Sequence, residues 1–142
     1  MHKNSEKIVN AMYENDAFSK WLGIERLEVS KGNCKLRMTI RKEMLNGFNI
    51  AHGGIAYSLA DSALAFAANT HGNKSLSLET KISHLKVVKE GDVLTAVVMK
   101  ESLSKKKGEY VISIINQDEL EIAIFKGIVH RTSNVWFSRH EE

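Results

Sequence analysis

The sequence has no proline and only one cysteine among its 142 residues, and these two absences limit what kind of protein it can be. A lone cysteine, Cys34, cannot form a disulfide within the chain, so a disulfide-stapled secreted fold is excluded and a reducing compartment fits. No Cys/His spacing resembles a zinc site, and we interpret Cys34 as a small strand residue. Since no proline, repeat or low-complexity linker divides the chain, we expect one domain over residues 1–142.

The sequence also has only a small excess of positive over negative charge. The formal net charge is +3 at pH 7, and the isoelectric point is near 9.0. Such mild basicity could help to hold a phosphorylated small molecule, but it gives only weak support for nucleic-acid binding. We therefore expect no nucleic-acid partner, because that hypothesis rests on the isoelectric point alone.

No segment has the composition of a membrane span or of a secretory signal. The one long apolar run contains Ser58, Asp61 and Ser62, which a membrane-spanning helix would not tolerate together. The N-terminal segment Met1–Lys7 lacks the apolar core of a signal peptide. We expect a cytoplasmic protein with no membrane partner.

The chain is organised around the loop Asn46–Gly54 and the apolar run Ile55–Ala68 that follows it. The run is rich in alanine and leucine and long enough for about four helical turns. Because it is apolar on nearly every face, it predicts a helix buried in the core. His71-Gly72 is a typical glycine C-cap signal and predicts where this helix ends.

One acid, Asp61, interrupts the predicted helix. The positions three and four residues away hold Ser58, Tyr57, Leu64 and Ala65, so no cation lies within one helical turn. A buried carboxylate costs free energy unless it is paired or faces a cavity. Asp61 is therefore the principal functional candidate, and the alternative is a structural acid that Ser58 or Tyr57 satisfies.

The predicted helix start near Gly53 is a second functional candidate. The first backbone N–H groups of a helix are free and carry partial positive charge, and glycines let another molecule approach them. Such a helix start could stabilise a carbonyl oxygen that becomes negative in a reaction. Asp61 lies about 13 Å along the axis from His52 and about 180° around it. One helix therefore cannot bring both groups to one substrate atom, so a shared site requires two copies in a two-fold dimer.

The other segments predict the elements that surround this helix. Residues 5–20 fit an amphipathic helix that Ser5 could cap and that 21–24 would end. Alternating residues predict two strands within 24–40, joined by a turn at Lys31–Asn33, and one strand over Ser75–Val88.

Three more strands, over 93–103, 110–116 and 120–131, are joined by short turns and predict an antiparallel meander. Val93–Met99 is apolar on both sides, which suggests a sheet covered on both faces or completed by a partner. From Asn134, with Trp136 and Phe137, we expect a flexible tail that is loosely held or docks on a partner. The fold class is α+β, with a strongly curved antiparallel sheet wrapped around one long helix.

With these residues in view, the chain resembles the hotdog-fold thioesterases, specifically the phenylacetic-acid-degradation (PaaI-type) group. The resemblance covers about residues 15–132 and rests on four motifs: Asn46-Gly47, His52-Gly-Gly54, Asp61 within Ser58-Leu-Ala-Asp61, and Phe125-Lys-Gly-Ile-Val-His-Arg131. The combination of these four motifs is far more specific than any one of them alone. It implies a hotdog fold, a homodimer commonly paired again into a tetramer, and hydrolysis of acyl-CoA thioesters. It also implies no metal or prosthetic group, since coenzyme A is part of the substrate.

The resemblance assigns catalytic roles to five residues. Asp61 resembles the catalytic carboxylate, acting as general base or as nucleophile, and the Gly53 amide resembles the oxyanion donor. Asn46 and His52 are similar to residues that shape the oxyanion end, although His52 could instead cap the helix and Asn46 could simply form the turn. Ser77 is the best match for a hydroxyl that positions the water, with Ser75 and Thr80 as alternatives.

Other residues would contact the substrate, and these are Gly54, Tyr57, His84, Lys126 and Arg131. Tyr57 could equally belong to the core. The lysines at 105–107 form what is usually a solvated turn, but they compete with Lys126 and Arg131 for the phosphates of coenzyme A. At His84 the chain departs from relatives, which often have an aromatic residue followed shortly by proline, so the acyl specificity stays open.

The leading hypothesis is an acyl-CoA thioesterase acting on aryl or medium-chain substrates. A non-catalytic hotdog module that binds or senses acyl-CoA is the alternative from another class. A hotdog dehydratase is also considered, although it would normally use a different set of acid and base residues.

Overall fold

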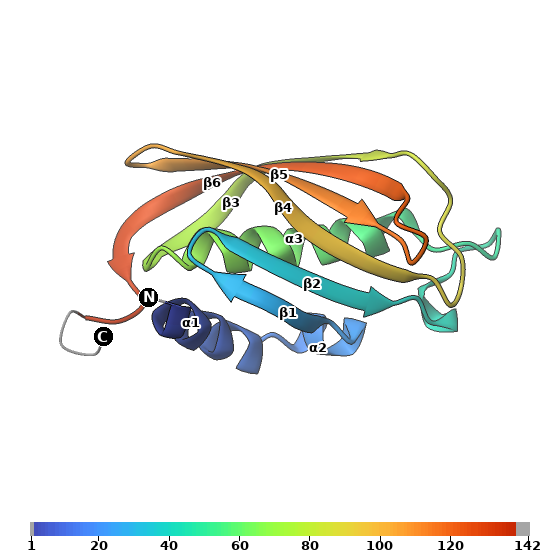
Figure 1. Cartoon of the computed structure of the whole chain (residues 1–142), viewed down its shortest axis with the longest axis horizontal. Coiled ribbons are helices and arrows are strands. Elements are labelled where there is room, and N and C mark those ends of the chain that lie inside the picture. Colours follow the sequence, from blue (N-terminus) through green and yellow to red (C-terminus); the bar gives the residue numbers. More distant parts are fainter. Residues whose placement is uncertain (1, 139–142) are drawn as a thin grey trace.

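A six-stranded antiparallel sheet arches over one long helix in this computed structural model, which describes residues 2–138 (Figure 1). The elements follow along the chain in this order: α1 His2–Glu14, α2 Ala17–Leu22, β1 Glu25–Ser30, β2 Asn33–Thr39, a 3-10 turn η1 Lys42–Met44, α3 Gly53–Asn69, β3 Asn73–His84, β4 Val93–Leu103, β5 Lys107–Ile115 and β6 Glu121–Val135. In the sheet the strand order is β1-β2-β4-β5-β6-β3, so β4, β5 and β6 form the predicted meander. The α+β prediction of a curved sheet around a central helix is confirmed.

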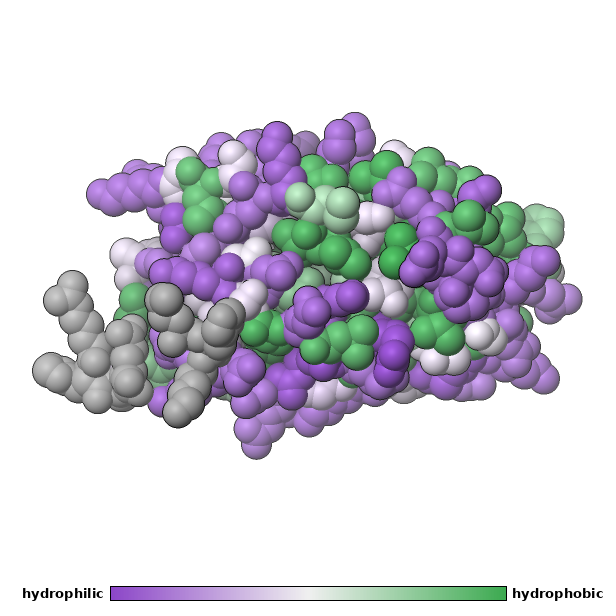
Figure 2. All heavy atoms as spheres, viewed as in Figure 1, coloured by the Kyte–Doolittle hydropathy of each residue, from purple (hydrophilic) through white to green (hydrophobic). Residues whose placement is uncertain are grey.

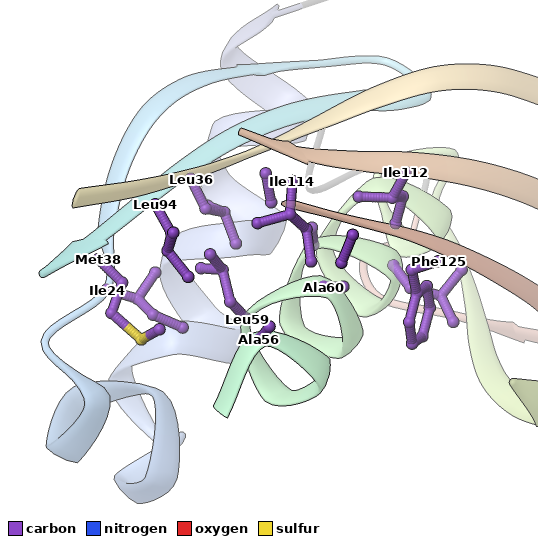
Figure 3. Packing of buried hydrophobic residues seen from close by; sticks show 14 of the residues in the cluster. Ile24, Leu36, Met38, Ala56, Leu59, Ala60, Leu94, Ile112, Ile114 and Phe125 are labelled. Carbon is purple, nitrogen blue, oxygen red and sulfur yellow. The ribbon is translucent and has the colours of Figure 1, made fainter. Parts of the chain in front are cut away.

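The core lies between α3 and the concave face of the sheet. Ala56, Leu59 and Ala60 of α3 point toward side chains that the strands contribute from above (Figure 3). These strand residues are fully or almost fully buried and include Leu36, Leu94, Ile112, Ile114 and Phe125. Alternation along β2 and β4 produces this face because successive strand residues point to opposite sides.

Close packing of α3 on β6 depends on one glycine. A Cβ on Gly127 would lie 2.6 Å from Cδ2 of Leu64, so no side chain fits between the helix and the strand there. The other face of the sheet is not fully covered: Val93, Thr95 and Val97 of β4 are half-buried. From the side shown in Figure 2, apolar residues reach the surface among polar ones.

The predicted single helix over residues 5–20 is wrong, because the chain breaks at Asn15–Asp16 into α1 and α2. Asp16 caps α2 by accepting a hydrogen bond from the Ser19 amide, and Gly23 ends it with a φ of 75°. Ser5 does not cap α1 but lies buried within it. The signal for the break was Asp16 itself, a residue type that favours N-caps.

The strand predicted for Ser75–Val88 ends earlier, at His84. The next residues turn back along the loop Asn46–Gly54, where the Ala51 amide donates to the Val88 carbonyl at 2.8 Å. This route brings residues 84–88 beside the start of α3.

The expected flexible tail is also wrong for residues 134–138. β6 continues to Val135, and the Trp136 indole donates to Oδ1 of Asn69 at 2.8 Å. Lys7 places its ammonium 4.3 Å from the centroid of the Phe137 ring. The segment therefore packs on its own chain, while residues 139–142 of the predicted tail lie outside the described residues.

Candidate active site

The loop before α3 is shaped by Asn46. Its side-chain oxygen accepts from the Phe48 amide at 2.9 Å and from the Ile50 amide at 3.4 Å. This Asx-type arrangement turns the chain back so that Leu45 and Ala51 form an isolated bridge. Asn46 thus forms the turn that leads into α3, and its side-chain oxygen is already used as an acceptor within that turn.

His52 is the N-cap of α3 and leaves one backbone amide open. Its Nδ1 accepts from the Gly54 N–H at 3.2 Å, so the Gly54 amide is occupied. Gly53 is the first residue of the helix, and within residues 2–138 nothing accepts from its N–H. A free amide at a helix N-terminus carries partial positive charge.

A cavity of about 320 Å³ lies beside this amide. Its walls come from the loop at Asn46–Gly53, from His84 at the end of β3, and from Lys86 and Val88 in the segment after it. His84 lies close to the helix start, with Nε2 3.4 Å from the position that a Cβ on Gly53 would take. Lys86 is the basic residue of this cavity, and sequence reasoning did not single it out.

Asp61 lies two turns further along α3, on the only side of the helix that the core leaves partly open. This half-buried stripe holds Tyr57, Ser58, Asp61, Ser62 and Ala65. Within the described part of the chain, the Asp61 carboxylate accepts no hydrogen bond, so neither Ser58 nor Tyr57 satisfies it. Burial, together with the negative charge of Asp16, raises the pKa of Asp61 above its ordinary value.

Asp16 is held near this carboxylate by a chain of hydrogen bonds that sequence reasoning missed. Ser19 donates its hydroxyl to Oδ2 of Asp16 at 2.6 Å, and the same hydroxyl lies 2.7 Å from that of Ser62. Ser62 is the residue next to Asp61. The start of α2 is therefore tied to α3 beside the candidate base, and a second carboxylate comes close to it.

The three hydroxyls considered for water positioning differ in their partners. Ser75 is buried and donates to the Asn73 carbonyl, and Thr80 is hydrogen-bonded to the hydroxyl of Tyr57. The hydroxyl of Ser77 is exposed and makes no hydrogen bond to any residue from 2 to 138. Tyr57 also packs edge-on against Phe125 with centroids 5.3 Å apart, so its ring and its hydroxyl are both engaged in the core.

Lys126 and Arg131 do not line the cavity beside Gly53. Lys126 lies on the face of the sheet opposite to α3, in a hollow of about 430 Å³ with Lys81 and Lys100. Arg131 donates to the Ser104 carbonyl at 2.7 Å, in the turn between β4 and β5. Within one chain, these two residues stand apart from the residues grouped around Gly53.

Asp61 lies eight positions after Gly53 on α3, which is about 12 Å along the helix axis. One chain therefore holds a polarising amide and a free carboxylate that cannot reach the same atom. The described residues hold no cluster of three or more side chains suited to a metal ion. None of their helices is both long and apolar enough to cross a membrane.

Comparisons with known proteins identify the family and the fold. A family model described as the thioesterase superfamily matches residues 48–123, which include the loop from Phe48 onward, α3, β3 to β5 and the start of β6. The acyl-coenzyme A thioesterase PaaI of Escherichia coli is 40% identical over 122 residues, covering 86% of this chain and 87% of that protein.

Two solved structures extend the likeness to the fold. PaaI from the phenylacetic acid degradation operon of E. coli superposes with a TM-score of 0.91 at 36% identity, covering 94% of this chain and 97% of that one. A mutant of the phenylacetic acid degradation protein PaaI of Thermus thermophilus gives 0.79 at 29% identity, covering 82% of this chain and all of that one.

Proposed function

The chain belongs to the thioesterase superfamily, and from that membership we propose that it hydrolyses acyl-CoA thioesters to a carboxylic acid and coenzyme A. The observation that carries the proposal is the pairing of two unsatisfied groups of opposite character. The Gly53 amide opens onto a cavity, and the Asp61 carboxylate lies half-buried without a hydrogen-bond partner among residues 2–138. A half-buried carboxylate without a partner costs free energy unless a ligand or another chain uses it, and the exposed Gly53 amide is free to bind an acceptor.

We propose that two chains share each active site. β3 is the long edge strand of the sheet and exposes Leu76 and Leu78, whose exposed fractions are 67% and 58%. A long edge strand with apolar side chains is a ready site for pairing with another strand. Two copies related by a two-fold axis would join their β3 strands, and the half-buried stripe of α3 beside β3 would face the partner. Asp61 of one chain would then meet Gly53 of the partner subunit.

In this site the amide of the partner's Gly53 donates to the thioester oxygen and stabilises the negative charge that develops on it. Asp61 accepts a proton from a water molecule, whose oxygen attacks the carbonyl carbon. The C–S bond of the tetrahedral intermediate then breaks, and the thiolate of coenzyme A leaves and takes up a proton. Asp61 suits the role of base because its raised pKa gives it a higher proton affinity than an ordinary carboxylate.

The remaining site residues have supporting roles in the proposal. His52 and Asn46 hold the helix start in place, His84 and Gly54 border the thioester, and Ser77 positions the water. We keep contacts of Lys126 and Arg131 with the phosphates of coenzyme A as predictions, and we add Lys86 because it lines the cavity beside Gly53. Tyr57 is a weaker candidate for substrate contact, because its hydroxyl is bound to Thr80.

We also propose that the enzyme needs no metal or prosthetic group, that it acts in the cytoplasm, and that its partners are acyl-CoA and further copies of itself. A dimer of dimers is the assembly we expect.

Replacement of Asp61 by Asn tests the proposal. The variant keeps the shape of the side chain but cannot accept a proton, so hydrolysis across a panel of acyl-CoA thioesters should fall by about 10²–10⁴-fold. Coenzyme A binding and the circular dichroism spectrum should stay as in the wild type. Wild-type turnover in this variant would refute the assignment, and tight acyl-CoA binding without hydrolysis by the wild type at any pH would favour a non-catalytic module.

A single-turnover reaction in ¹⁸O-labelled water separates the two roles of Asp61. A general base puts the label only into the acid product. A nucleophile forms an anhydride between Asp61 and the acyl group as coenzyme A leaves; when water opens the anhydride at the Asp61 carbonyl carbon, ¹⁸O enters Asp61 and an Asp61 oxygen leaves in the acid. Label in Asp61 therefore identifies the nucleophile.

A further inference from the structure

His84 carries an imidazole without a partner at the edge of the cavity beside Gly53. Within residues 2–138 its ring makes no hydrogen bond and no ion pair. The two other histidines near α3 are engaged: Nδ1 of His52 caps the helix, and the ring of His71 is bound to a carboxylate at 2.6 Å. In the described part of the chain no carboxylate lines this cavity, so the imidazole of His84 is free to act on a ligand there.

The backbone on both sides of His84 is held by hydrogen bonds. His84 is the last residue of β3 and pairs with Ala123 of β6. The next two amides, those of Leu85 and Lys86, donate to the Ile122 carbonyl at 2.8 and 3.2 Å. The imidazole is therefore presented to the cavity from the fixed end of a strand.

The ring of His84 lies against the start of α3. Its Nε2 is 3.4 Å, and its Cε1 3.6 Å, from the position that a Cβ on Gly53 would take. Since a Cβ lies about 1.5 Å from its Cα, Nε2 is within about 5 Å of the Cα of Gly53. A thioester whose oxygen accepts from the Gly53 amide carries its sulfur on the same carbonyl carbon. The imidazole nitrogen can therefore reach the sulfur while the amide holds the oxygen.

The cavity determines which side of the thioester meets His84. Lys86 lies two residues beyond His84 and also lines the cavity, where its positive charge suits the phosphates of coenzyme A. With coenzyme A along this wall, the sulfur that joins it to the acyl group is the thioester atom next to the imidazole. His84 therefore borders the bond that breaks.

Two other groups of the cavity carry protons but are less suited to protonating a leaving group. His52 accepts a hydrogen bond on Nδ1, so its one proton is on Nε2, and the loss of that proton would leave an imidazolate anion. Lys86 carries an ammonium, and ammonium groups are far weaker acids than imidazolium ions. A free imidazole can give up and regain a proton near neutral pH, because histidine ordinarily titrates between about pH 5 and 8.

From this geometry we propose that His84 is the general acid that protonates the sulfur of coenzyme A as the C–S bond breaks. The proposal rests on the proposed thioesterase function and assigns the source of the proton that the leaving thiolate takes up. The imidazolium of His84 transfers its Nε2 proton to the sulfur, which keeps the electron pair of the broken bond, while the C=O bond of the acid product re-forms. The partner's Asp61 then releases to the solvent the proton that it took from water, and the imidazole regains one from the solvent. The products are the carboxylic acid and the free thiol, and both groups return to their starting states.

The test uses two substrates with the same acyl group and leaving groups of different basicity. His84→Gln keeps a side chain that can donate a hydrogen bond but cannot transfer a proton. It should lower kcat for the coenzyme A thioester by about 10²-fold or more, but by less than about threefold for the thioester of 4-nitrothiophenol, whose thiolate leaves without being protonated. His130→Gln is the matched control, because it changes an exposed histidine of β6 outside the described lining of this cavity, and it should leave both rates unchanged. In His84→Ala, added imidazole should restore part of the lost hydrolysis of the coenzyme A thioester.

The outcomes separate the role of His84 from the function itself. Equal losses with both leaving groups would place His84 beside the thioester oxygen or in a structural role, and a raised KM with unchanged kcat would make it a binding residue. Either result overturns the proposal while the thioesterase function stands, and so does wild-type kcat for the coenzyme A thioester in folded His84→Gln protein. If the wild type hydrolyses no thioester, the proposed function fails and the assignment of His84 fails with it.

Discussion

Gly53→Pro is the substitution that tests the polarising amide most cleanly. Gly53 is the first residue of α3, a position at which proline is well tolerated because it already has the required φ. His52 has φ −59° and ψ 139°, the extended conformation that a residue before proline prefers. The Gly53 N–H donates to nothing among residues 2–138, so proline removes no hydrogen bond of the described fold.

The expected loss is that of one oxyanion donor. Removal of such a donor costs about 10²–10³ in kcat, or about 3–4 kcal/mol of transition-state stabilisation. Steady-state hydrolysis of the best substrate of the acyl-CoA panel measures it, and thermal unfolding checks that the variant remains folded. Gly53→Ala is the matched control, because it keeps the N–H and brings a Cβ only to 3.4 Å from Nε2 of His84.

Gly53→Ala should therefore retain far more activity than Gly53→Pro. If proline and alanine reduce kcat equally in folded protein, a steric effect explains the loss. A folded proline variant with wild-type kcat would show that the amide of Gly53 takes no part in the reaction.

Three other substitutions test the electrostatics and packing. Asp16→Asn keeps an N-cap that can accept a hydrogen bond from the Ser19 amide but removes a negative charge near Asp61. The pKa of Asp61 should therefore fall part of the way toward its ordinary value, and the acidic limb of the pH profile of kcat/KM should move to lower pH. An acidic limb that does not move would contradict the coupling between Asp16 and Asp61. Because the pKa of Asp61 is raised on folding, its ionised form destabilises the native state, so Asp61→Asn should raise the melting temperature at neutral pH, with the gain lost as the pH falls below the ordinary value of 3.8. A gain that persists at low pH would point to another cause. Gly127→Ala should lower the free energy of unfolding in urea by about 1–3 kcal/mol, since the new Cβ would press on Leu64, and a neutral result would mean that α3 can move away from β6.

The sequence predicted the elements whose pattern is local. Alternation defined β2 and β4, and the composition of the run after Gly53 defined α3. Asp61 was singled out because it is the one acid in this apolar helix, although the sequence predicted it buried and the structure leaves it half-buried. These features depend on short-range periodicity, which a single sequence displays directly.

Features that depend on distant contacts were missed or wrong. The helix over residues 5–20 was predicted as one piece because its apolar residues continue past Asn15, and the cap that divides it depends on Asp16. Trp136 was assigned to a flexible tail because its neighbours are charged, although its partner, Asn69, is 67 residues away in the sequence. The approach of Asp16 to Asp61 through Ser19 and Ser62 likewise joins α2 to α3, and no local pattern indicates it.

A mixed dimer tests the shared site most directly. Asp61→Asn and Gly53→Pro chains, each nearly inactive alone, are unfolded together, refolded in equal amounts and assayed. If each site takes its carboxylate from one chain and its amide from the other, half of the dimers are mixed and each has one intact site, so activity should recover to about a quarter of the wild type. Activity no higher than that of the two variants alone, in mixtures shown to contain the mixed dimer, would contradict a site built from two chains.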